Sequence, residues 1–147
     1  MDQVIRGRPL VEGETVGLAM VSDQPLSFWG GYDQNTGEII DRRHPLSGKI
    51  GTNRILVIPH TIGSSTTTAV LLEAVRQGKA PAGVITTGLA SFVALSSIVA
   101  DELYGRNFPV VMVSEGDFAV LESGQWVEIK GDGIIEISPG PQTDSFS

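Results

Sequence analysis

The pattern of apolar and polar positions predicts a strand, a loop and a helix within residues 54–79. Residues 55–58 are four consecutive apolar residues followed by a proline, as is typical of a strand covered on both faces. Apolar residues then recur at helical spacing and indicate a helix that begins at Ser64 or Ser65. They are Val70, Leu71, Ala74 and Val75. Gly78 predicts the end of this helix, because glycine readily adopts the left-handed conformation of a helix C-cap.

A similar alternation of strands and helices continues downstream. Residues 82–86 and 108–113 predict two further buried strands, and residues 90–104 between them indicate a second amphipathic helix. The apolar residues of this helix are Phe92, Leu95, Val99 and Leu103, with Ile98 beside them. Strands that alternate with helices imply right-handed parallel crossovers, so we expect a short parallel α/β layer.

Towards the C-terminus the period of the pattern changes to two. This predicts strands at residues 118–121, 125–129 and 134–137, with hairpin turns between them. A further strand is predicted at residues 15–21, where Gly17 indicates a bulge or a close backbone approach. We expect these strands to form an antiparallel layer or a small barrel beside the α/β layer.

Five consecutive hydroxyl residues, 64–68, stand at the predicted start of the first helix. The first N–H groups of a helix have no partners within it, so such a start is a site for an anion. The alternative is that Ser64 is only a helix N-cap, a position that serine commonly occupies. The clustering favours a site, because one cap needs one hydroxyl and threonine is a mediocre helix former. The sequence leaves both interpretations open.

Two other segments carry candidate side chains. Phe28 and Trp29 stand directly before a pair of glycines. They predict either an aromatic anchor packed on the sheet or a loop that lines a pocket. His44 precedes a proline in a polar loop, and we expect it to be a structural residue rather than a catalyst.

Composition narrows the classes of partner and cofactor. The chain has 10 basic and 17 acidic residues and a net charge of −7, and the basic residues are scattered, so we expect no nucleic-acid and no membrane partner. The absence of cysteine excludes disulfides, thiolate catalysis and cysteine-ligated zinc or iron–sulfur clusters within this chain. Charged residues make up only 18% of the chain, which predicts a somewhat apolar surface and therefore a partner.

Length and apolar runs bear on organisation and location. The 147 residues suit one domain, and we expect residues 1–138 to form it while residues 139–147, which lack an apolar pattern, are disordered. No apolar run approaches the roughly 20 residues of a membrane helix, and the first residues do not form a signal peptide. We therefore expect a cytoplasmic protein.

Five short motifs, in order and with matching spacing, resemble the small subunit, or swivel domain, of aconitase X over residues 4–138. They are Pro25-Leu-Ser-Phe-Trp-Gly-Gly, Thr36-Gly-Glu-Ile-Ile-Asp41, His44-Pro-Leu, Gly63-Ser-Ser-Thr and Gly78-Lys-Ala-Pro-Ala. The resemblance implies a swivelling β/β/α fold that docks, as a heterodimer, on a larger cysteine-bearing subunit. It implies an iron–sulfur cluster or metal on that subunit and none in this chain. The implied activity is a hydro-lyase (dehydratase) reaction on a small hydroxy acid, either cis-3-hydroxy-L-proline or mevalonate 5-phosphate.

The resemblance also implies roles for the loop before the first helix. Ser64 matches the catalytic base, and Gly63, Ser65 and Thr66 would contact the substrate. A serine alkoxide needs helix N–H groups and a nearby cation to stabilise it at neutral pH. Ordinary aconitases carry an arginine where this chain has Thr66, so bidentate recognition of a carboxylate from this loop is lost. Residues 59–62 are less glycine-rich than expected for the phosphomevalonate enzymes, which favours cis-3-hydroxy-L-proline.

Two rival functions belong to other classes. Swivelling β/β/α domains also serve as phosphohistidine carriers, and His60 lies in the same loop. However, His60 precedes the glycine rather than opening the helix, and the sequence of the carrier type is absent. The other rival is a non-catalytic, anion-binding subunit with a structural or regulatory role.

Overall fold

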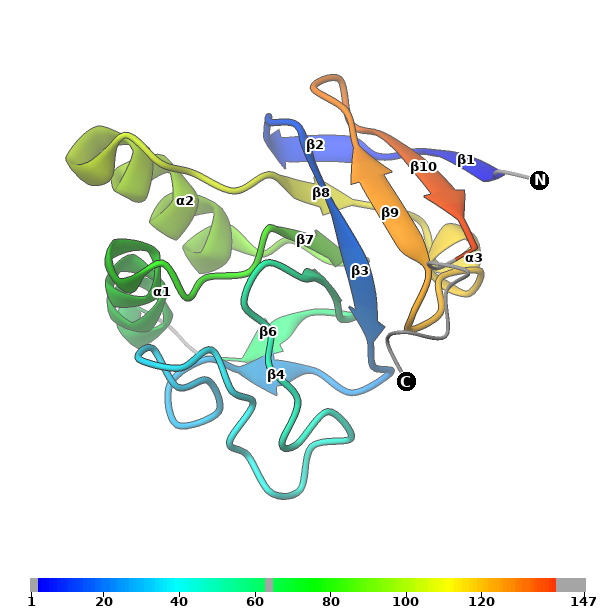
Figure 1. Ribbon diagram of the computed structural model, residues 1–147. Helices are drawn as coiled ribbons and strands as arrows, with labels where there is room; N and C mark the ends of the chain where they lie inside the picture. Colours follow the sequence, from blue (N-terminus) through cyan, green and yellow to red (C-terminus); the bar gives the residue numbers. More distant parts are fainter. Residues whose placement is uncertain (1–2, 63–64, 140–147) are drawn as a thin grey trace.

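An eight-stranded mixed sheet organises the computed structural model, which describes residues 3–62 and 65–139. Within these residues the elements are β1 (Gln3–Arg6), β2 (Arg8–Val11), β3 (Thr15–Val21), β4 (Leu26–Ser27), β5 (Ile55–Val57), β6 (Thr61–Ile62), α1 (Ser65–Gln77), β7 (Gly83–Thr86), α2 (Ser91–Tyr104), β8 (Val110–Met112), α3 (Glu115–Phe118), β9 (Trp126–Ile129) and β10 (Ile134–Ser138). The large sheet has the order β1-β10-β9-β3-β5-β7-β8-β2, and β4 pairs with β6 separately (Figure 1). Of the tail for which we expected disorder, residues 140–147 lie outside the described part.

The large sheet curls into a nearly closed barrel because its two edge strands are consecutive in the chain. Only Gly7 separates β1 from β2, and its N–H donates to Gly133 O at 3.0 Å. A Cβ atom at Gly7 would lie 2.3 Å from Val111 Cγ1, so a larger residue does not fit at this crossing. The interior of the barrel is apolar. Its buried residues are Ile5, Ala19, Ile55, Val57, Ile85, Val111, Val113, Leu121, Val127, Ile129, Ile135 and Ile137.

Strand β3 joins the parallel and antiparallel parts of the sheet. Its first half pairs antiparallel with β9 and its second half pairs parallel with β5. A Cβ atom on Gly17 would lie 2.9 Å from Asn53 O, which confirms the close backbone approach predicted at this glycine. β5, β7 and β8 continue in parallel, so the expected α/β layer and small barrel are both present and share one sheet.

Helices α1 and α2 lie side by side on one flank of the parallel strands (Figure 1). α1 ends at Gly78 as predicted and α2 ends at Gly105, and both glycines adopt the left-handed conformation, with φ values of 73° and 65°. Beneath them lies a second apolar cluster, to which β3, β5, β7 and β8 contribute their outer faces. The parallel strands are therefore buried on both sides, which explains their continuous apolar runs.

The orientation of α2 differs from that of an ordinary amphipathic helix, whose apolar stripe packs on the core. Its buried residues are Val93, Ser96, Ser97 and Ala100. Its larger apolar residues are exposed, namely Phe92, Leu95, Ile98 and Leu103, with Val99 half-buried. The physical reason is that small residues allow α2 to approach α1 closely. Ser97 Oγ also donates to Phe108 O and accepts from Phe108 N, which fixes the face of α2 that turns inward.

The strand predicted at residues 118–121 is wrong. Ser114 Oγ accepts a hydrogen bond from Asp117 N at 3.1 Å and caps a one-turn helix, α3. Local capping overrides a weak period-two pattern here. The other two C-terminal strands are confirmed as β9 and β10.

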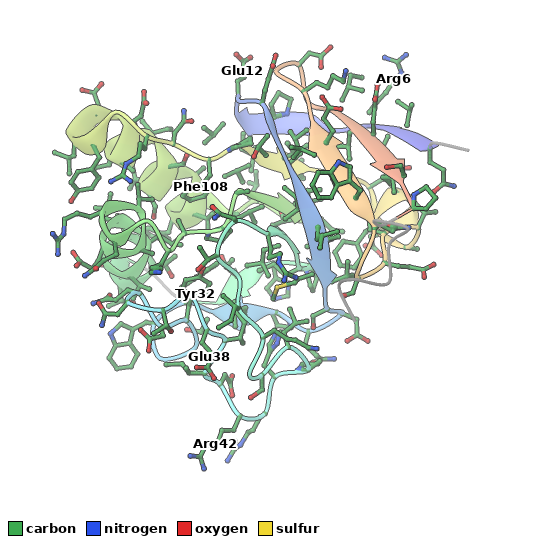
Figure 2. All side chains as sticks on the ribbon, in the orientation of Figure 1. Arg6, Glu12, Tyr32, Glu38, Arg42 and Phe108 are labelled. Carbon is green, nitrogen blue, oxygen red and sulfur yellow. The ribbon has the colours of Figure 1, made fainter. Side chains whose placement is uncertain are left out.

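The irregular segment between β4 and β5 is anchored by Tyr32, whose side chain points into the body of the molecule while Arg42 lies at the periphery (Figure 2). The hydroxyl of Tyr32 donates to Lys79 O at 2.6 Å. Burial raises the pKa of this phenol above its usual value, although a hydrogen bond with Thr52 opposes the change.

No helix in the described part of the chain is both long enough and apolar enough to cross a membrane.

Candidate functional site

The loop between β5 and α1 lies at the carboxyl edge of the parallel strands, where sites of open α/β sheets commonly form. The loops that follow β3 and β7 meet it there. Ser22 N donates to Val57 O at 3.0 Å, and Ile58 N donates to Ile85 O at 3.0 Å. The hydrogen bonds between β3, β5 and β7 therefore continue to the ends of these strands. The three loops that follow them lie at the same edge of the sheet.

Pro59 holds the first part of this loop against the loop after β7. Its carbonyl accepts hydrogen bonds from Thr87 N and Gly88 N, both at 3.1 Å, and from Thr87 Oγ1 at 2.9 Å. Three donors on one carbonyl oxygen limit the movement of the chain at this point. We did not predict a role for Thr87. The available signal was a threonine pair directly after a buried strand, at residues 86–87.

The small β4–β6 sheet holds the other end of the loop. Leu26 pairs with Thr61 and Ser27 with Ile62, in parallel. Phe28 follows and is fully buried, whereas Trp29 is 64% exposed. The structure confirms the aromatic anchor for Phe28, whereas the pocket-lining interpretation stays a prediction, because Trp29 faces solvent.

The predicted site residues fall on both sides of a gap in the described chain. Gly63 and Ser64 lie outside the described residues. Ser65 and Thr66 are the first two residues of α1, and both are exposed. Thr67 is buried in the core, so the hydroxyl cluster does not all face one site.

The start of α1 is electrostatically suited to an anion. The helix has 13 residues and carries no acidic side chain in its first turn. The partial positive charge of the free N–H groups is therefore not neutralised by the helix itself. This agrees with an anion site at Ser65 and Thr66, although it assigns no ligand.

The two histidines occupy different environments. His44 is buried, its Nδ1 accepts from Leu46 N at 3.1 Å, and its Nε2 lies 3.3 Å from Gln24 O. Both ring nitrogens are thus engaged, which confirms a structural histidine. His60 is exposed and precedes β6 rather than opening α1. This position does not resemble a histidine presented at a helix start.

The described residues do not fit a metal centre. They contain no group of three or more His, Cys, Asp or Glu side chains that could hold a metal ion. The full sequence also lacks cysteine, the usual ligand of iron–sulfur clusters.

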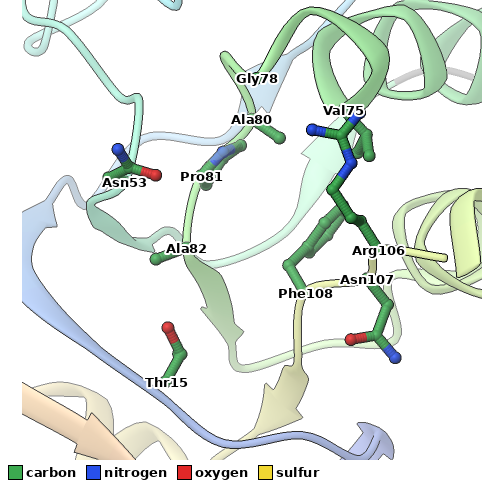
Figure 3. A pocket seen from close by; sticks show the side chains of 10 residues that line it. All are labelled: Thr15, Asn53, Val75, Gly78, Ala80, Pro81, Ala82, Arg106, Asn107 and Phe108. Carbon is green, nitrogen blue, oxygen red and sulfur yellow. The ribbon is translucent and has the colours of Figure 1, made fainter. Parts of the chain in front are cut away.

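A hollow of about 270 Å³ lies at the opposite edge of the parallel strands, where they begin (Figure 3). Its lining residues are Thr15, Asn53, Val75, Gly78, Ala80, Pro81, Ala82, Arg106, Asn107 and Phe108. Of these only Arg106 is charged, and its Nη2 donates to Arg76 O at 3.3 Å. The hollow is therefore separate from the loop that precedes α1 and holds no candidate nucleophile or acid.

Comparison with known proteins gives consistent matches over nearly the whole chain. The family model described as "Aconitase X swivel domain" matches residues 4–137. A cis-3-hydroxy-L-proline dehydratase from Pseudomonas aeruginosa is 41% identical over 130 residues, which are 88% of this chain but 22% of that protein. A phosphomevalonate dehydratase small subunit from Thermococcus onnurineus is 34% identical over 134 residues, which are 90% of this chain and 97% of that protein.

A solved structure has the same fold. The crystal structure of Thermococcus kodakaraensis aconitase X, in its holo-form, superimposes with a TM-score of 0.82 and 31% identity. The match covers 92% of this chain and 98% of that one.

Proposed function

The chain belongs to the aconitase X swivel-domain family, and on that premise we propose that it is the small subunit of a heteromeric hydro-lyase that dehydrates a small hydroxy acid. The chain spans 22% of the length of the Pseudomonas dehydratase but 97% of the Thermococcus small subunit. Its relatives therefore include proteins that carry this domain within a longer chain and proteins that consist of little else. The function is that of one part of an enzyme, which is inactive without its large subunit.

The observation that supports this function best is the loop between β5 and α1. It is held at Pro59 by three hydrogen bonds and at Thr61–Ile62 by pairing with β4. It then leads into a helix whose first turn carries no acidic side chain. A loop that is fixed at its entry and ends at free N–H groups suits the stabilisation of negative charge.

In the proposed reaction Ser64 Oγ removes a proton from the carbon next to the substrate carboxylate. The electron pair of the broken C–H bond forms a double bond, and the hydroxyl group leaves the neighbouring carbon with the electron pair of its C–O bond. The proton taken up by Ser64 balances this hydroxide, so that one water is lost overall and the serine oxyanion is restored. The N–H groups at the start of α1 stabilise the serine oxyanion before transfer, and Gly63, Ser65 and Thr66 contact the substrate carboxylate.

The metal centre of the proposed enzyme belongs to the larger, cysteine-bearing subunit. The described residues offer no ligand set, and the sequence has no cysteine. Whether the centre is an iron–sulfur cluster or a mononuclear metal does not alter the role of this chain, which supplies the base and the anion-binding loop.

The substrate we favour is cis-3-hydroxy-L-proline. The identity to the Pseudomonas enzyme, 41%, exceeds the 34% to the Thermococcus small subunit. Residues 55–75 also contain no lysine or arginine, so this part of the chain offers no cation to a phosphate group. Mevalonate 5-phosphate is the alternative, and it is favoured by the near-complete match in length to the Thermococcus small subunit.

The test is turnover of the assembled complex with Ser64→Ala. We expect a loss of roughly 10²–10⁴-fold in kcat, as is typical when a general base is removed. Thr15→Val, which removes a hydroxyl group at the opposite edge of the parallel strands, is the control and should leave kcat unchanged. Both substrates are assayed. A Ser64→Ala complex that assembles and loses less than about tenfold contradicts the assignment of the base.

A further control separates the rival classes. His60→Ala should retain dehydratase activity, whereas a phosphohistidine carrier would lose an acid-labile phosphate after incubation with a labelled phosphoryl donor. A non-catalytic subunit would show unchanged turnover with Ser64→Ala.

A further inference from the structure

Helix α2 carries its large apolar side chains on the side that faces away from the domain. Four such residues on α2 and Leu89, which lies just before the helix, are between 38% and 69% exposed, and we call these five residues the α2 outer face. They are Leu89, Phe92, Leu95, Ile98 and Leu103. The opposite side of the helix, which packs on the domain, consists mainly of serine and alanine with Val93. The larger apolar side chains of this helix therefore remain in contact with water.

The size of this surface is that of the largest apolar patch on a typical monomer, which is often functional. At roughly 200 Å² for one fully exposed large side chain, the five residues leave about 500 Å² of apolar surface in contact with water. A standard interface buries roughly 800 Å² on each partner, so the α2 outer face would form most of the apolar centre of one. Surfaces of this size commonly mark a site of protein association.

The position of the α2 outer face indicates what covers it. Leu89 directly follows Gly88, whose N–H donates to the carbonyl of Pro59 in the loop that leads to Ser64. The outer face therefore starts at the candidate site and runs away from it along α2, over roughly 20 Å. A subunit that brings a metal centre to Ser64 must cover this end of the sheet, so it meets Leu89 and Phe92 first.

Charge at the far end of the helix adds to this argument. Glu102 lies four residues after Ile98 and is therefore on the same side of α2. It stands in the last turn, where a negative charge is unfavourable, and α2 has no basic residue there. A second copy of this acidic chain, with a net charge of −7, would bring Glu102 towards another negative surface. A partner with a basic residue at this position suits it better.

We propose that the α2 outer face is the docking surface for the large subunit, which presents an apolar groove with a basic residue opposite Glu102. This inference rests on the proposed function, because it assumes that such a subunit exists. It extends that function by assigning the contact to one helix face rather than to the loops at the carboxyl edge alone.

The test measures the affinity of the full chain for the purified large subunit of the same organism by isothermal titration calorimetry. Leu95→Lys and Leu103→Lys should each weaken binding at least tenfold. The matched controls are Val16→Lys and Val4→Lys, which replace similarly exposed apolar residues on β3 and β1. The control lysines stand opposite glutamates of neighbouring strands and should be tolerated. Thermal unfolding of each free variant confirms that the domain is intact.

A second pair of variants tests the charge. Glu102→Lys should weaken binding at least fivefold, whereas Asp101→Lys, one residue away and off the outer face, should have little effect. Equal effects of the two charge reversals would show that only the net charge of the chain matters and would overturn the assignment of Glu102.

The outcomes distinguish the docking surface from the proposed function. Unchanged binding by Leu95→Lys and Leu103→Lys in an active complex overturns the docking surface and leaves the function standing. A wild-type chain that binds the large subunit through this face without dehydrating either substrate overturns the proposed function and leaves the docking surface standing. A wild-type chain that does not bind the subunit contradicts both. If light scattering finds a dimer of the free chain that Leu95→Lys dissolves, while subunit binding is unchanged, a second copy is the occupant and our proposal is wrong.

Discussion

Two adjacent serines of α2 allow the energetic role of one hydrogen-bond pair to be measured. Ser96 and Ser97 are both fully buried, and each hydroxyl donates to a backbone carbonyl at 2.5 Å. The hydroxyl of Ser97 contacts both backbone groups of Phe108, because it donates to the carbonyl of Phe108 and accepts from the N–H of Phe108 at 2.9 Å. Ser96 binds only Phe92 O, which the helical N–H of Ser96 also reaches. The two substitutions remove similar volumes but leave different backbone groups without partners.

Ser97→Ala leaves a buried N–H and a buried carbonyl of Phe108 unsatisfied. Each such group costs roughly 1–3 kcal/mol, so we expect a loss of about 2–6 kcal/mol in the free energy of unfolding and a fall in Tm of about 6–18 °C. Ser96→Ala leaves no group without a partner, and we expect about 1 kcal/mol or less. Urea unfolding of the two variants, followed by circular dichroism, measures the difference. A Ser97→Ala variant that is no less stable than Ser96→Ala would refute the reasoning.

Two further predictions concern the phenol of Tyr32 and the close approach at Gly17. Burial raises the pKa of Tyr32, so the neutral phenol stabilises the fold below the ordinary tyrosine pKa of about 10, and this contribution is lost as pH rises above that value. In urea unfolding at increasing alkaline pH, the stability of the wild type should therefore fall more steeply than that of Tyr32→Phe. Parallel curves for the two proteins would contradict this prediction. Gly17→Ala places a Cβ 2.9 Å from Asn53 O, and we expect the free energy of unfolding, measured in urea, to fall by about 1–3 kcal/mol. An unchanged unfolding midpoint would show that β3 can shift to make room for the methyl group.

The parallel half of the fold was predictable because its signals are local. Continuous apolar runs marked β5, β7 and β8, and helical spacing with a terminal glycine marked α1 and α2. β1 and β2 were missed because each has four residues and pairs with strands more than a hundred positions away. A short segment has no local pattern that reports such pairing.

The inward face of α2 was the main feature that the sequence could not indicate. Helical periodicity finds an apolar stripe but does not say whether the stripe packs on the same domain or on another one. In this chain the inward face is chosen by Ser97 and its two hydrogen bonds to Phe108, which are tertiary contacts.

The candidate site was predicted in part. Ser65 and Thr66 are at the helix start as expected, whereas Thr67 is in the core and the contact of Thr87 with the loop at Pro59 was not predicted. The roles of Gly63 and Ser64 stay predictions, because these residues lie outside the described part of the chain.

The closure of the barrel at Gly7 has a consequence for the order of folding. β1 pairs with β10, about 130 positions further along the chain, so the barrel closes only after β10 has left the ribosome. Until then β9 presents an unpaired edge, and the first residues of the chain have no strand to join. A protein shortened before β10 would retain the parallel strands and both long helices but expose two edges that can pair with other chains. The last strand therefore protects the newly made domain against aggregation as much as it completes the barrel.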